Sequence, residues 1–228
     1  MTGTDVFGLL RGGLVVSCQA YEGEPLHGPQ FMSAMARSAV LGGAAGVRIN
    51  GPADVEAVRA AVPVPVIGLW KDGDGDVYIT PTLEHALTVV RAGADIVALD
   101  ATARPRPDGR GLAETIDRIH QAGALVMADV STAEEGLAAA EFGADCVSTT
   151  LSGYTSASPP PDGPDLGLVA VLADKLDIPL FAEGRIGTPA EAARALELGA
   201  HAVVVGGAIT RPADITQRFA RVLKETRS

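Results

Sequence analysis

Residues 92–100 read Ala-Gly-Ala-Asp-Ile-Val-Ala-Leu-Asp. This order indicates the end of a helix, a glycine, a tight turn, a buried strand and an acidic residue, one after another. The same order begins at residues 142–147, Phe-Gly-Ala-Asp-Cys-Val, and at residues 198–203, Leu-Gly-Ala-His-Ala-Val. Glycine commonly ends helices, and continuous apolar runs are typical of strands in a covered parallel sheet. A repeated helix-to-strand joint indicates a fold built from βα units.

The rest of the chain continues this alternation. Strands are expected at Leu14–Val16, Val47–Ile49, Val66–Trp70, Ile96–Leu99, Leu125–Ala128, Val147–Leu151, Leu180–Ala182 and Ala202–Val205. Helical spacing of apolar residues predicts helices at Pro29–Leu41, Pro52–Ala61, Thr82–Ala92, Gly111–Ala122, Thr132–Phe142, Asp165–Leu176, Pro189–Leu198 and Pro212–Lys224. Eight such units predict an α/β fold, a (β/α)8 TIM barrel, as a single domain over residues 1–228. The alternative is a doubly wound open sheet, but no strong dinucleotide-binding fingerprint is present.

Two helix starts carry a capping box, in which a Ser or Thr cap is followed three residues later by Glu. Residues 188–191, Thr-Pro-Ala-Glu, also have proline at the first helical position. Residues 131–134, Ser-Thr-Ala-Glu, predict the same motif with Ser131 as the cap. The proline-rich stretch Ser156–Asp165 follows the sixth strand and is expected to cover the site rather than to separate domains.

The chain is acidic, with a formal net charge of −10 over 228 residues. This charge argues against nucleic acid and anionic membranes as partners, because both attract basic surfaces. A small anionic substrate remains possible, since a local cluster of Arg and Lys can outweigh the global sign. Cys18 and Cys146 are expected at different heights of the barrel and therefore as reduced thiols. No signal peptide or membrane-spanning run is recognised, which predicts a cytoplasmic protein.

Barrels of this kind carry their active sites at the carboxyl ends of the strands. Lys71 follows the third strand, on the same side as Ile67 and Leu69 if the strand alternates. Should those side chains point inward, burial lowers the pKa of the amine and makes Lys71 a base or a Schiff-base nucleophile. The alternative is that the Lys71 side chain extends into solvent.

Two carboxylates stand at other strand ends. Glu183, after the seventh strand, is a candidate general acid; its alternative role is a structural ion pair with Arg185 or Arg48. Asp129, after the fifth strand, is expected to tune Lys71 by charge, or else to cap the next helix. The fourth and sixth strands are expected to be mainly structural, or at most to have a secondary role in the site.

Hydrogen-bonding and cationic side chains at further strand ends predict a sugar phosphate site. Gln19, Arg48, Asn50 and Arg185 offer the several donors and acceptors that fix sugar hydroxyls. The glycines Gly184, Gly206 and Gly207 follow the last two strands, where barrels commonly bind phosphate through backbone N–H groups, and Arg211 adds charge. These glycines could alternatively serve only as tight turns.

No metal or cofactor is predicted. The histidines lack metal-ligand spacing, and only His27 is expected near the site. Residues 72–76, Asp-Gly-Asp-Gly-Asp, lack the preceding helix and the bidentate glutamate of a calcium loop, so a solvated turn is expected.

These segments together resemble the N-acetylmannosamine-6-phosphate 2-epimerase family. The resemblance covers nearly the whole chain and lies in residues 12–20, 47–52, 77–82, 98–102, 104–109, 148–154, 182–186 and 205–212. One departure is the segment at residues 72–76, which is usually longer in the family and often holds a basic residue and a tyrosine.

The resemblance implies interconversion of N-acetyl-D-mannosamine 6-phosphate and N-acetyl-D-glucosamine 6-phosphate, a step in using sialic acids. It implies that Lys71 and Glu183 are catalytic, that Asp129, Gln19 and Arg48 contact substrate, and that Arg211 contacts the phosphate. A Schiff-base aldolase and a non-catalytic sugar-phosphate-binding protein remain alternatives. A homodimer is possible, because barrels of this type often dimerise.

Overall fold

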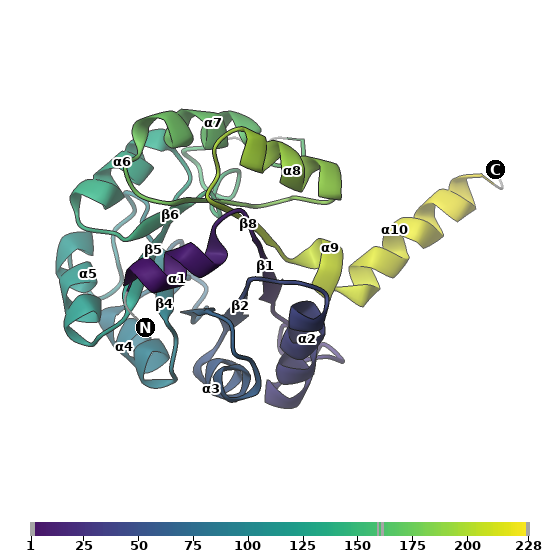
Figure 1. The fold of residues 1–228 in the computed structure, drawn as a ribbon, viewed down its shortest axis with the longest axis horizontal. Helices are drawn as coiled ribbons and strands as arrows, with labels where there is room; N and C mark the ends of the chain where they lie inside the picture. Colours follow the sequence, from purple (N-terminus) through teal and green to yellow (C-terminus); the bar gives the residue numbers. More distant parts are fainter. Residues whose placement is uncertain (1–2, 159, 161, 227–228) are drawn as a thin grey trace.

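The computed structural model describes residues 3–158, 160 and 162–226, and Figure 1 shows them as a ring of helices around a barrel. The strands are β1 (Leu14–Cys18), β2 (Gly46–Asn50), β3 (Val66–Leu69), β4 (Ile96–Asp100), β5 (Leu125–Asp129), β6 (Cys146–Ser148), β7 (Leu180–Glu183) and β8 (Ala202–Val205). The helices are α1 (Gly3–Leu10), α2 (Pro29–Leu41), α3 (Pro52–Ala61), α4 (Leu83–Arg91), α5 (Leu112–Gln121), α6 (Ala133–Glu141), α7 (Leu166–Lys175), α8 (Pro189–Glu197), α9 (Gly207–Thr210) and α10 (Pro212–Glu225).

All strand pairs are parallel, and β8 pairs with β1, so the sheet closes in chain order. This confirms the predicted (β/α)8 barrel and excludes the open sheet. Each strand alternates between two apolar layers, as expected for a sheet that is buried on both faces. In β3, Ile67 and Leu69 belong to the layer inside the barrel, while Val66 packs in the outer layer against the helices.

One predicted capping box is displaced by a residue. The box at Thr188 and Glu191 is present as predicted, but α6 is capped by Thr132 with Glu135, not by Ser131 with Glu134. Thr132 has the extended backbone of a cap and its hydroxyl accepts from the Glu135 N–H, whereas the Ser131 hydroxyl donates to the Glu135 carboxylate. Two adjacent hydroxyl residues made the register ambiguous in the sequence.

A helix that the sequence analysis did not predict, α1, lies across the amino-terminal end of the barrel (Figure 1). Val6 and Leu10 are buried with the inner barrel layer. The Phe7 ring meets Phe181 edge to face, and the Phe7 carbonyl accepts a hydrogen bond from His201. Helix α1 thus closes the amino-terminal end of the barrel, and the carboxyl ends of the strands form the open end.

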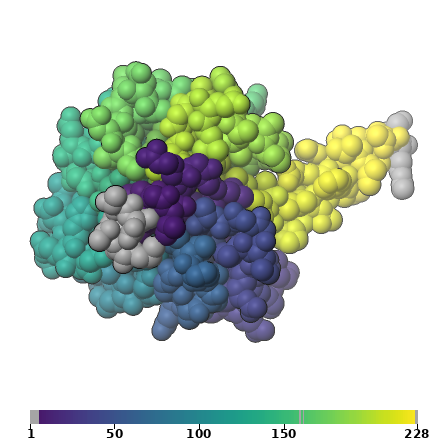
Figure 2. Space-filling view, viewed as in Figure 1, coloured from purple at the N-terminus to yellow at the C-terminus, as the bar shows by residue number. Residues whose placement is uncertain are grey.

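The last helix, α10, projects away from the barrel (Figures 1 and 2). Its residue range is close to the predicted one, but it does not cover the barrel as the other helices do, and none of its residues is buried. Phe219 and Leu223 are 70 % and 62 % exposed, a large fraction for such apolar side chains. The helix therefore presents an unpartnered apolar face.

Other predictions concern the thiols, the site cover and the membrane. Both cysteines are free, as predicted; both are also buried, and burial raises the pKa of Cys18 to about 12. The predicted cover Ser156–Asp165 includes Pro159 and Pro161, which lie outside the described residues. Within the described ranges, no helix combines the length and hydropathy that crossing a bilayer requires.

The packing of β3 against α4 leaves no room for a side chain at Gly68. A Cβ there would lie 2.6 Å from Cγ1 of Val89 and 2.7 Å from Cβ of Ala94. We expect Gly68→Ala to lower the free energy of unfolding by about 1–3 kcal/mol, because overpacking forces the strand and helix apart. Denaturant unfolding measures this, with Gly75→Ala as the control, since a Cβ at Gly75 meets no atom within 4 Å. Equal stabilities of the two variants would contradict the packing.

Candidate active site

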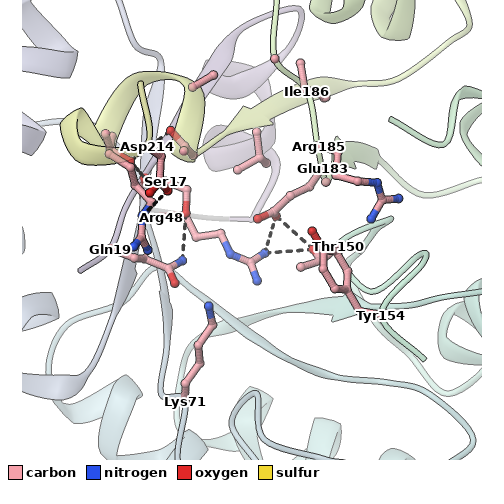
Figure 3. A pocket seen from close by; sticks show the side chains of 18 of the residues that line it. Ser17, Gln19, Arg48, Lys71, Thr150, Tyr154, Glu183, Arg185, Ile186 and Asp214 are labelled. Atoms are coloured by element: carbon pink, nitrogen blue, oxygen red, sulfur yellow. Dashed lines mark hydrogen bonds and ion pairs between the residues drawn. The ribbon is translucent and has the colours of Figure 1, made fainter. Parts of the chain in front are cut away.

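A cavity of about 490 Å³ opens at the carboxyl ends of the strands (Figure 3). Its lining includes most of the predicted site residues: Gln19, Arg48, Lys71, Glu183, Gly184, Arg185, Gly206, Gly207 and Arg211. Side chains from distant parts of the sequence meet here because every strand of a closed parallel barrel ends at the same mouth. The sequence prediction of one shared cavity is therefore met for these residues.

Arg48 occupies the floor of the cavity and is 1 % exposed. Its Nη1 and Nη2 donate to the two carboxylate oxygens of Asp129 at 3.0 and 2.6 Å, a bidentate pair across the barrel. Nη1 also lies 2.8 Å from Oε2 of Glu183. One buried guanidinium thus joins two carboxylates, which fixes both in place.

Glu183 is held between Arg48 and the hydroxyl of Thr150, which lies 3.0 Å from Oε2. Burial raises the pKa of Glu183, while the charge of Arg48 opposes the shift. The Thr150 hydroxyl also lies 2.8 Å from Oδ1 of Asp129. The hydroxyl has a single hydrogen, which it donates to one carboxylate or the other, and its hydrogen bond to Glu183 favours the ionised form of that residue, as the charge of Arg48 does. Burial outweighs these contacts, so the pKa of Glu183 still lies above its ordinary value.

Lys71 extends into the cavity from the opposite side to Glu183 (Figure 3). The backbone N–H of Lys71 donates to Oδ1 of Asn50 at 2.8 Å. Lys71 also forms an antiparallel bridge with Ile79, which closes a short hairpin around the solvated turn at residues 72–76. The amine lies 5.6 Å from the centroid of the Tyr21 ring. Burial, followed by the charge of Arg48, lowers the pKa of the amine. Lys71 is thus a half-buried amine with reduced affinity for its proton.

Two predicted substrate contacts lie outside the cavity lining. Asp129 is fully buried beneath Arg48, and Asn50 uses its amide oxygen on the backbone of Lys71. Both side chains position a lining residue, and the sequence could not distinguish this from direct contact because all these residues stand at strand ends. Their contact with substrate stays a prediction.

The glycine-rich turns form the other side of the cavity. Gly184 has φ of 106° and lines the cavity beside Arg185, whose own φ of 55° is unusual for a residue with a side chain. Gly206 precedes the short helix α9, and a Cβ there would lie 3.4 Å from the Cβ of Ser17. Backbone atoms therefore border the cavity at the ends of β7 and β8, where the sequence predicts phosphate.

Three arginines surround these turns. Arg185 donates to the carbonyls of Gly163 and Ser152 and lies over the Tyr154 ring. Arg211 pairs with Glu24 and, at 2.9 Å, with Asp214. Arg218 reaches the same lining from α10. The basic residues of the lining are Arg48, Lys71, Arg185, Arg211 and Arg218, against the acidic Glu183 and Asp214. The cavity is therefore locally basic on an acidic protein.

The sequence analysis missed several lining residues. Thr150, which follows β6, contacts both Glu183 and Asp129, so the sixth strand has the secondary role that the sequence analysis left open. Tyr21 and Tyr78 lie in loops after β1 and β3. A signal for Thr150 was present in the polar run at residues 148–150, Ser-Thr-Thr, directly after an apolar strand. Loop tyrosines offered no comparable pattern.

No metal centre is found among the described residues, since no three His, Cys, Asp or Glu side chains group closely enough to hold an ion. Of the histidines, His85 bonds to Thr82 and lies 3.1 Å from Asp72, and His201 is at the closed end of the barrel.

Comparisons with known proteins agree on one family. A family model described as "Putative N-acetylmannosamine-6-phosphate epimerase" matches residues 32–225. The chain belongs to this epimerase family. The "Putative N-acetylmannosamine-6-phosphate 2-epimerase" of Cutibacterium acnes is 55 % identical over 218 residues, which cover 94 % of this chain and 95 % of the relative. A relative of the same name from Caldanaerobacter subterraneus is 53 % identical over 228 residues, covering 98 % and 96 %.

A solved structure supports the same assignment. The N-acetylmannosamine-6-phosphate 2-epimerase of Clostridium perfringens superposes with a TM-score of 0.92 at 44 % identity, covering 95 % of both chains. A thiamine phosphate pyrophosphorylase of Pyrococcus furiosus has a TM-score of 0.63 at 18 % identity and shares the fold alone. Membership in the epimerase family confirms the resemblance recognised in the sequence and makes the chain a member of an isomerase family.

The buried Arg48–Asp129 pair generates a prediction about stability. We expect Asp129→Asn to lower the free energy of unfolding by about 3–5 kcal/mol, because it leaves a buried guanidinium without its bidentate partner. Denaturant unfolding measures the change. The control is Glu114→Gln, which removes an exposed ion pair with Arg110 and should change the stability by no more than about 1 kcal/mol. Similar losses in both variants would argue against the buried pair.

Proposed function

We propose that this protein is an epimerase that interconverts N-acetyl-D-mannosamine 6-phosphate and N-acetyl-D-glucosamine 6-phosphate, as in the use of sialic acids. The observation that carries the proposal is the placement of an amine with a lowered pKa, Lys71, and a carboxyl with a raised pKa, Glu183, in one cavity. Family membership supplies the substrate class.

Epimerisation at C2 starts from the open-chain sugar, whose C1 aldehyde makes the C2 hydrogen acidic. Lys71 takes the C2 proton, and the C2–H electron pair moves into a C1–C2 double bond as the C1 oxygen becomes an enolate. Burial favours the neutral, basic form of the amine, which this step needs. The positive charge of Arg48 on the cavity floor stabilises the enolate oxygen.

Glu183 returns a proton to the other face of C2, and the double-bond electrons form the new C–H bond as the aldehyde is restored. Burial raises the pKa of Glu183 and so favours the protonated form that can donate, against the opposing effects of Arg48 and Thr150. In the reverse direction the two residues exchange roles. One proton leaves and one returns, so the reaction needs no cofactor as an electron sink.

The remaining residues position the substrate. Gln19 and Arg185 bind sugar oxygens from the lining, and Asn50 and Asp129 contribute by holding Lys71 and Arg48. The phosphate lies against Gly184, Gly206 and Gly207 beside Arg211, where backbone N–H groups and a guanidinium are available.

Solvent exchange tests the reaction. We expect the wild-type protein to incorporate deuterium from D2O at C2 of the sugar phosphate, and Lys71→Ala to slow this incorporation by at least about 100-fold, because general acid–base catalysis by one group contributes on that order. Proton NMR follows the C2 signal. Thr88→Ala is the control, since the Thr88 hydroxyl makes its hydrogen bonds within α4, to Glu84 and Arg91, and Thr88 does not line the cavity.

Glu183→Gln separates the two proton carriers. If exchange at C2 continues while epimerisation stops, the two-carrier mechanism holds; if both continue, Lys71 serves both faces and the role of Glu183 is wrong. Reduction with borohydride in the presence of substrate tests the aldolase alternative, which requires a covalent imine on Lys71. Tight binding without any exchange would instead indicate a binding protein.

We also propose that the protein forms a homodimer through α10. Phe219, Val222 and Leu223 are spaced three and four residues apart, so they share one face, and each is more than half exposed. A second copy of the chain offers a matching apolar face by symmetry. Burial against it removes this surface from water.

Sedimentation equilibrium tests the assembly. We expect a dimer for the wild-type protein and a monomer for Phe219→Glu, since burying a carboxylate in the apolar contact is unfavourable. Gln217→Glu, which adds the same charge on the opposite side of α10, should leave the dimer intact. A wild-type protein that sediments as a monomer would contradict the proposal.

A further inference from the structure

The substrate cavity receives two side chains from α10, an element with no buried residue. Asp214 and Arg218 are four residues apart, so they lie on the same side of the helix and face the barrel mouth. Figure 3 shows Asp214 at the edge of the cavity, beside the segment that follows β8. The projecting helix therefore takes part in shaping the site.

Arg218 extends from α10 toward the turn after β7. Its Nη1 lies 3.9 Å from the place that a Cβ on Gly187 would occupy. Gly184 and Gly207, on the turns that border the predicted phosphate position, line the same cavity. The guanidinium thus stands beside the turn after β7, on the predicted phosphate side of the cavity.

Arg218 differs from the neighbouring Arg211 and Arg185 in the partners of its guanidinium. Arg211 is compensated by Glu24 and Asp214, and Arg185 is held by backbone carbonyls. Across the described part of the chain, Arg218 makes neither a hydrogen bond nor an ion pair. Its donors are available to a ligand, and a guanidinium matches the oxygens of a phosphate in a bidentate geometry.

We propose that Arg218 binds the 6-phosphate of the substrate and thereby makes α10 part of the specificity for phosphorylated sugars. This inference rests on the proposed function for the identity of the sugar phosphate. The contact is remote from C2 and is the same before and after proton transfer, so its loss raises KM and leaves kcat nearly unchanged.

Calorimetric titration with N-acetyl-D-mannosamine 6-phosphate and with inorganic phosphate tests the contact directly. We expect Arg218→Ala to weaken both affinities by about 10- to 100-fold, the range for a hydrogen bond to a charged group. Arg218→Lys keeps the charge without the bidentate geometry and should recover part of the loss. The matched control is Arg221→Ala, which removes an arginine one turn further along α10 that does not line this cavity.

Unchanged phosphate affinity in Arg218→Ala would overturn the proposal, as would an equal loss in Arg221→Ala, which would indicate a general effect of charge. Sedimentation of each variant provides a further check. The proposal is also overturned if Arg218→Ala changes the assembly as well as the phosphate affinity, and Arg218→Lys recovers none of that affinity. Titration needs no turnover, so the two proposals can fail separately. If the wild-type protein binds sugar phosphate through Arg218 but exchanges no C2 proton, the proposed epimerase activity is refuted and the Arg218 contact is not.

Discussion

The site depends on the burial of Arg48 among carboxylates. A guanidinium that is 1 % exposed must be compensated by charge, since an isolated buried ion is very unfavourable. Asp129 supplies the bidentate partner and Glu183 the second. Burial raises the pKa of Glu183 and lowers the pKa of Lys71; the positive charge of Arg48 opposes the first shift and adds to the second. One buried charge thus acts on both groups that are proposed to transfer protons.

The barrel can support this buried charge because its other end is closed. Inner-layer side chains such as Leu69 and Phe181, together with Leu10 of α1, exclude water from below. With the amino-terminal end filled, polar side chains gather where the strands end and the loops begin. The division between an apolar lower barrel and a polar mouth follows from the order of residues in each strand, in which the apolar run comes first.

Much of this was predictable because it is local in the sequence. The repeated joint at residues 92–97, 142–147 and 198–203 predicts the units and their order, and a polar residue after an apolar run predicts a position at the mouth. What a side chain does there was not predictable. Asp129 and Glu183 look alike in sequence, but one is buried beneath Arg48 and the other lines the cavity. That difference depends on contacts across the barrel.

The helices α1 and α10 show a second limit of the sequence. In α10, the periodicity of Phe219, Val222 and Leu223 predicts an amphipathic helix, but periodicity alone does not say which surface the apolar face meets. In the structure, Asp214 and Arg218 line the cavity, while Phe219, Val222 and Leu223 stay more than half exposed, with Val222 one turn beyond Arg218. In the proposed homodimer, the second copy stabilises this helix, which has no buried residue in its own chain and yet carries charge to the substrate cavity. Assembly and substrate binding would then meet in one helix, because whatever covers the apolar face also fixes the position of Arg218.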